Sequence, residues 1–173
     1  MSDATVAQAL RSAARLVVVE APGGCGKTYQ GARYACDIAP ALGDGRLLIL
    51  THTNAACDVF AGRTHGLSRH VEIRTIDGLV IEIAGAYRHP LGLPEDVGAW
   101  ARRTPKGYDL LGERVARLLT RHPAIADCVA RRYPIVVCDE HQDASADQHT
   151  LVMALHRGGA QLRVFADPMQ MIF

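Results

Sequence analysis

The stretch Ala21-Pro-Gly-Gly-Cys-Gly-Lys-Thr28 decides the fold that we expect for this chain. It follows an apolar run at residues 16–19 and precedes a segment with helical spacing at residues 27–38. A glycine-rich loop between a strand and a helix is the setting of a phosphate-binding loop, or P-loop. In such a loop the backbone N–H groups and the positive end of the helix hold a β-phosphate. Lys27 would reach the β- and γ-phosphate oxygens, and the Thr28 hydroxyl would hold Mg²⁺.

An apolar strand that ends in two acids supplies the second half of this predicted site. It is Ile135-Val-Val-Cys-Asp-Glu140, and in a P-loop fold it would end beside the loop. Asp139 would then hold the Mg²⁺ that bridges the phosphates, and Glu140 would polarise the attacking water as general base. Either segment alone could be a solvated turn or strand end, but the two together favour a nucleotide site. Its predicted phosphate-binding residues are Ala21, Pro22, Gly23, Gly24, Cys25, Gly26, Lys27 and Thr28.

Composition limits the other possibilities. The chain has 173 residues, 49% of them hydrophobic, which is enough for one well-buried domain. The net charge of +1 neither demands nor forbids a nucleic-acid partner. Five cysteines without CxxC spacing argue against disulfides or a zinc site, so we expect reduced thiols in a cytoplasmic protein. No apolar run approaches the roughly 20 residues of a membrane span, and the N-terminus lacks a signal-peptide pattern.

Apolar runs alternate with helical segments along the chain. This alternation predicts an α/β fold, with a parallel sheet covered by helices on both faces. Residues 85–107, rich in Gly, Pro and Arg, show no sustained period and suggest an insertion or a mobile excursion. The expected strands are residues 16–20, 46–51, 71–73, 134–138 and 161–166. The expected helices are residues 4–14, 27–38, 54–62, the segment after 75–78 to about 84, 108–119, 124–131 and 147–156.

Four further segments carry a family resemblance. Asp139-Glu-His-Gln-Asp143 resembles the DExQD box of UvrD/Rep-like superfamily 1 helicases. Thr51-His-Thr-Asn-Ala-Ala56 is similar to their TxTNxAA segment, Thr75-Ile-Asp-Gly78 to their T-[FI]-H-G segment, and Ala166-Asp-Pro-Met-Gln-Met-Ile-Phe173 to their GDPxQxIY box. With the P-loop, five collinear motifs span residues 16–173. The resemblance implies that residues 1–173 form the ATP-binding, first RecA-like domain of a P-loop NTPase, with a short helical insertion at about 85–133.

The resemblance also assigns roles to single residues. Gln170, together with Asp167, would sense the γ-phosphate, which makes Gln170 a catalytic residue beside Glu140 and Lys27. Gln142 and Asp143 would couple the DExQD strand to that sensor. Gln8 would contact adenine, although a surface glutamine on a short helix is an equal alternative. The residues on the single-stranded DNA path would be Thr51, His52, Thr53, Asn54, Thr75 and Asp77.

The chain departs from the family pattern at several positions. His52 stands where the family has an aromatic residue, and base stacking is a main source of single-strand affinity. Asp77 replaces a histidine and puts a negative charge near the expected phosphates. Ala21 and Ala166 replace glycines, and Phe173 replaces a tyrosine. The family's second RecA-like domain, which supplies arginine fingers, would begin after Phe173, so we expect these residues to be a fragment or one half of a split enzyme.

The leading hypothesis is therefore the ATP-binding half of a DNA helicase or translocase that uses ATP and Mg²⁺. It would move on single-stranded DNA, 3′ to 5′ by resemblance, in repair, recombination or replication. The isolated chain should bind Mg-ATP, hydrolyse it slowly and fail to unwind DNA, because a second domain or partner must supply arginines. The alternative is a truncated or regulatory ATP-dependent single-strand-binding module without unwinding activity. The DExQD, TxTNxAA and GDPxQxIY-like segments argue against a third class, a P-loop kinase.

Overall fold

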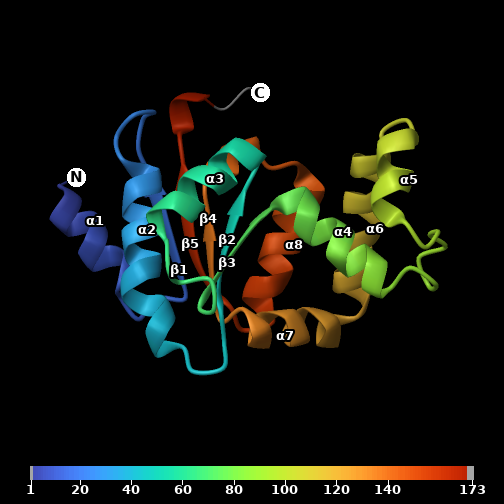
Figure 1. The fold of residues 1–173 in the computed structure, drawn as a ribbon, viewed down its shortest axis with the longest axis horizontal. Coiled ribbons are helices and arrows are strands. Elements are labelled where there is room, and N and C mark those ends of the chain that lie inside the picture. The colour runs from blue at the N-terminus through green and yellow to red at the C-terminus, as the bar shows by residue number, and fades with distance from the viewer. Residues whose placement is uncertain (1, 171–173) are drawn as a thin grey trace.

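A five-stranded parallel sheet forms the centre of the molecule (Figure 1). The computed structural model describes residues 2–170. Every pair of neighbouring strands is parallel, which confirms the sheet predicted from the continuous apolar runs. In spatial order the strands are β1 (Leu16–Glu20), β5 (Gln161–Ala166), β4 (Ile135–Cys138), β2 (Leu47–Thr51) and β3 (Val71–Thr75).

Helices cover both faces of this sheet, as Figure 1 shows. Side chains alternate between the faces along β2: Leu47 and Ile49 pack with the first group of helices, and Leu48 and Leu50 with the second. The first group is α1 (Asp3–Leu10), α2 (Lys27–Ile38) and α3 (Asn54–Arg63). The second is α4 (Ile76–Ala86), α6 (Gly107–Arg121), α7 (Pro123–Arg132) and α8 (Ala146–Arg157), with α5 (Val97–Arg103) packed on α4 and α6. Three short 3₁₀ helices cover Ala39–Ala41, His141–Asp143 and Pro168–Gln170.

The segment without a sequence period contains a packed helix. Val97 and Ala101 of α5 are buried in the same cluster as α4 and α6. A Cβ at Gly107 would overlap the Ala101 carbonyl, so the absence of a side chain lets the start of α6 lie against α5. A helix of only seven residues makes two turns, too few for a period to be visible. The helix expected at residues 4–14 is shorter in the structure, where α1 begins at Asp3 and ends at Leu10.

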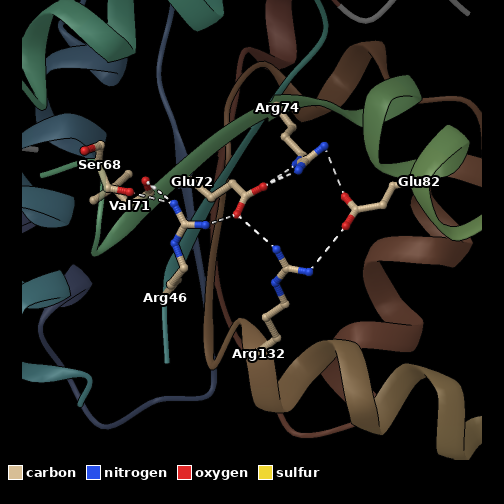
Figure 2. A network of polar contacts seen from close by, with 7 residues as sticks. All are labelled: Arg46, Ser68, Val71, Glu72, Arg74, Glu82 and Arg132. Carbon is tan, nitrogen blue, oxygen red and sulfur yellow. Dashed lines mark hydrogen bonds and ion pairs between the residues drawn. The ribbon is translucent and has the colours of Figure 1, made fainter. Parts of the chain in front are cut away.

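A network of charged side chains fastens the β3 edge of the sheet to the second helical layer (Figure 2). Glu72 of β3, with a side chain only 10% exposed, pairs with Arg46, Arg74 and Arg132. Arg74 and Arg132 also reach Glu82 of α4, at 3.1 and 3.4 Å. Burial alone would raise the pKa of Glu72, but the hydrogen bond and charge of Arg74, helped by Arg46, outweigh burial and lower it. The network therefore links Arg46, the residue before β2, with β3, α4 and α7 through one buried carboxylate.

Replacing this carboxylate should destabilise the fold. We expect Glu72→Gln to lower the free energy of unfolding by about 1–3 kcal/mol at pH 7, because the arginines lose their buried anionic partner. A carboxylate whose pKa is lowered by folding stabilises the native state above its unfolded pKa, and this contribution disappears as the pH falls through the folded pKa. The difference between variant and parent in urea unfolding should therefore shrink in acid.

The matched control is Glu113→Gln on α6, which removes an exposed ion pair with Arg117. Its effect should stay below about 0.5 kcal/mol. Equal effects of the two substitutions would contradict the role given to Glu72.

Candidate active site

The predicted P-loop connects β1 to α2 at the carboxyl edge of the sheet. Gly24 and Gly26 have φ of 76° and 77°, a left-handed conformation that favours glycine. Gly26 is the N-cap of α2, and no side chain caps this helix. The N–H groups of the first turn of α2 therefore have no capping side chain, and anion binding by them stays a prediction.

Lys27 lies at the centre of the site and is only 6% exposed. Its Nζ donates to the carbonyl oxygens of Ala21 at 2.9 Å and Pro22 at 3.3 Å. It also lies 3.6 Å from Glu140 Oε1 and 3.9 Å from Asp167 Oδ2. One ammonium group thus joins the P-loop to the ends of β4 and β5, which are far apart in the sequence.

Thr28 and Asp139 form a pair of oxygen ligands beside this lysine. The Thr28 hydroxyl donates to Asp139 Oδ2 at 3.1 Å. Asp139 is 3% exposed, and among residues 2–170 its buried Oδ1 has no hydrogen-bond partner. Burial raises the pKa of this carboxyl, and the Thr28 hydrogen bond opposes that rise. A bound cation would satisfy the free oxygen and favour the ionised carboxylate, so this pair fits Mg²⁺.

The number of carboxylates also suits that ion. Within the described part of the chain, no group of three or more His, Cys, Asp or Glu side chains could hold a metal. Mg²⁺ at sites of this kind is held by one or two protein groups and completes its shell with phosphate oxygens and water. Thr28 and Asp139 therefore suit Mg²⁺ that arrives with a nucleotide.

Gln142 connects the predicted base to the segment after β5. Its Nε2 donates to Glu140 Oε2 at 2.7 Å, and its Oε1 accepts from the Asp167 N–H at 2.9 Å. Glu140 has a φ of 50°, which is uncommon for a residue with a side chain and marks a constrained turn. Gln170 belongs to the 3₁₀ helix after Asp167, but its side chain and residues 171–173 lie outside what the structure describes, so its sensor role stays a prediction.

A cavity of about 200 Å³ adjoins the P-loop on the side of α1. Gln8, the residue predicted to contact adenine, is exposed on α1 and does not line this cavity. Three polar residues that the sequence analysis missed, Asp3, Glu20 and Gln30, do line it. Gln30 follows Lys27 by three positions on α2, and that spacing is the signal that could have revealed it. The lining residues are Asp3, Val6, Val19, Glu20, Ala21, Pro22, Cys25, Lys27, Gln30 and Phe165.

The residues predicted to contact DNA separate into two groups. His52 and Asp77 line a second cavity of about 490 Å³, between the carboxyl edge of the sheet and α6. Thr51 instead is 1% exposed and donates to the Thr53 carbonyl. Thr53 caps α3, as Thr75 caps α4. The exposed Asn54 begins α3.

This second cavity is acidic. Asp77 shares it with Asp109 and Asp143, and it accepts a hydrogen bond from Gln148 at 2.8 Å. Burial lowers the pKa of His52, and the nearby carboxylates oppose that shift. These carboxylates make the cavity poorly suited to a phosphate.

The β1-α2 loop and the acids at the ends of β4 and β5 define a P-loop fold of the RecA-like type. A family model for the UvrD/REP helicase N-terminal domain matches residues 103–173, from the end of α5 through the last motif. This match supports assignment of the chain to the UvrD-like helicase family. Among curated proteins, no sequence matches the chain. None of the helices in residues 2–170 is long and apolar enough to cross a membrane.

Proposed function

We propose that this chain is the ATP-binding half of a DNA helicase or translocase. It would bind Mg-ATP, hydrolyse it and use the cycle to move on single-stranded DNA, 3′ to 5′, in repair, recombination or replication. The observation that carries this proposal is the convergence of Lys27, Asp139, Glu140 and Asp167 around one P-loop. The family match supports helicase chemistry. We also propose that the protein is cytoplasmic.

Each side chain has one task in the proposed reaction. Lys27 exchanges the P-loop carbonyls for β- and γ-phosphate oxygens and neutralises part of their charge. Thr28 and Asp139 would hold Mg²⁺, which would neutralise the developing negative charge on the phosphates. Glu140 accepts a proton from the attacking water, and the hydrogen bond from Gln142 orients its carboxylate.

Gln142 also supports coupling to movement. It contacts both the base Glu140 and the backbone of Asp167, so a shift of one segment is transmitted to the other. In this proposal Asp167 and Gln170 detect the γ-phosphate of bound ATP. The exposed residues around His52 and Asn54 contact the DNA. The acidic cavity beside His52 implies that phosphates pass outside it.

A second domain or partner would complete the site. Among residues 2–170, no arginine lines the cavity beside the P-loop or pairs with Asp139, Glu140 or Asp167. Arginine fingers contribute about 10³–10⁵ in rate to P-loop enzymes. The absence of such an arginine among residues 2–170 is also compatible with a second function, an ATP-dependent single-strand-binding module without unwinding activity.

The test is steady-state ATP hydrolysis by the purified chain with Mg²⁺, with and without single-stranded DNA, beside unwinding of a tailed duplex. We expect tight Mg-ATP binding, slow turnover and no unwinding. DNA-stimulated turnover after addition of a second RecA-like domain would support the motor over the binding module. Absence of Mg-ATP binding would contradict both functions, and unwinding by the chain alone would contradict the need for outside arginines.

A further inference from the structure

A cavity of about 290 Å³ lies between α6 and the loop that joins α4 to α5. These elements form the end of the molecule opposite α1 (Figure 1). Arg114, Arg117 and Arg121 of α6 line the cavity together with His122, and among residues 2–170 no carboxylate lines it. It shares no lining residue with the cavities beside the P-loop and beside His52. The cavity is therefore a separate cationic surface, which suits an anionic ligand.

The three arginines stand on one face of α6, because they follow one another at intervals of three and four residues. Like charges at this spacing repel one another. Glu113 pairs with Arg117, but among residues 2–170 neither Arg114 nor Arg121 pairs with a carboxylate. A ligand that brings negative groups to this face would relieve the repulsion and form charge-assisted hydrogen bonds.

Arg114 is held in place before any ligand binds. Its guanidinium lies over the Trp100 ring, 5.3 Å from the centroid, and its Nη1 donates to the Leu91 carbonyl at 3.1 Å. Among residues 2–170 that carbonyl is its hydrogen-bond partner, so most of its N–H groups remain for a ligand. A guanidinium that is already fixed loses little conformational freedom on binding and can pair with a carboxylate in a bidentate manner.

The rest of the lining is apolar and favours a peptide over nucleic acid. Pro90, Leu91 and Leu118 line the cavity beside the arginines, and Leu118 is only 8% exposed. An apolar side chain can cover such a surface, whereas the outside of a DNA duplex presents phosphates. The acidic cavity on the predicted DNA path is lined by Tyr108 and Asp109, which by helical spacing lie on another side of α6 from the arginines.

We propose that this cavity binds an acidic peptide segment of a partner protein. Carboxylates of the peptide pair with the three arginines, and an apolar side chain next to them packs on Leu91 and Leu118. The segment would be a short run of glutamates or aspartates that includes a leucine or a similar side chain. This interaction needs neither ATP nor DNA, so it is independent of the proposed function.

The experiment measures Kd by fluorescence anisotropy for short labelled peptides at one fixed salt concentration. The first peptide has a leucine among glutamates, the second has glutamines in place of the glutamates, and the third has serine in place of the leucine. We expect the parent chain to bind the first peptide about tenfold more tightly than either of the others.

Two double variants of equal charge test the arginines. Arg117→Ala/Arg121→Ala should weaken binding of the first peptide roughly 3- to 30-fold, because both side chains are exposed and each contributes one ion pair. Arg33→Ala/Arg157→Ala removes two exposed arginines outside the cavity and should keep the parental Kd. Equal losses in the two double variants, or no binding of the first peptide by the parent, would overturn the proposal.

Leu91→Ala tests the apolar contact. The Leu91 carbonyl and its hydrogen bond with Arg114 remain, so the arginine rim is kept. Binding of the first peptide should weaken about fivefold, and binding of the serine peptide should not change. Equal binding of these two peptides by the parent would contradict the apolar contact. A labelled DNA duplex that binds more tightly than the peptide, and is lost in Arg117→Ala/Arg121→Ala, would show a nucleic-acid contact instead.

Discussion

Lys27→Ala should weaken Mg-ATP binding by roughly 10²–10³-fold, which corresponds to a loss of about 3–4 kcal/mol in binding free energy. This is the interaction energy expected for one positive charge close to a phosphate at an intermediate dielectric constant. The effect is large because the ammonium group is buried and lies between the P-loop carbonyls and two carboxylates. Without it, Glu140 and Asp167 would face the incoming triphosphate with no cation of the chain between them. Equilibrium titration with a fluorescent ATP analogue measures this loss.

The control for this variant is Lys106→Ala. Lys106 is the other lysine of the chain, is exposed, and lies at the start of α6. Its removal lowers the net charge by the same amount and should leave the affinity for ATP unchanged. Equal losses in the two variants would mean that overall charge, rather than the P-loop, determines binding.

The strands and the P-loop could be predicted closely because their signals are local. Residues 16–20 and 27–38 were expected as a strand and a helix, and the structure has β1 and α2 with the same bounds. A buried strand is a short apolar run, and a glycine-rich loop between a strand and a helix leaves few alternatives. The parallel order of the sheet followed from the helices between the strands.

The features of the site that local sequence patterns did not predict depend on the direction in which a side chain points. Thr51 matches a motif that the family uses on its DNA path, yet it points into the protein and is 1% exposed. Gln8 and Gln30 have the same chemistry, and only the packing of α1 against α2 and β1 decides which of them lines the cavity. The Glu72 network joins Arg46, which precedes β2, to β3, α4 and α7, and no sequence pattern within any one of these segments predicts it.

Glu140→Gln should keep Mg-ATP binding and stop turnover. The carboxamide has nearly the same size, and its oxygen can still accept the hydrogen bond from Gln142, so the turn after β4 should keep its shape. Asp139 and Thr28 are untouched, and Mg²⁺ coordination remains. A carboxamide cannot accept a proton from water, so the rate should fall by about 10²–10⁴-fold, the usual contribution of a general base.

Comparison of the two site variants separates binding from chemistry. Lys27→Ala acts on Kd, whereas Glu140→Gln acts on kcat and should leave Kd within about threefold of the parent value. Removing the negative charge at residue 140 should, if anything, increase the affinity for the triphosphate. Weaker ATP binding in Glu140→Gln would therefore show that the Lys27–Glu140 contact maintains the conformation of the P-loop. Hydrolysis at the parental rate, measured by phosphate release at saturating Mg-ATP, would show that another group activates the water and that the base has been wrongly assigned.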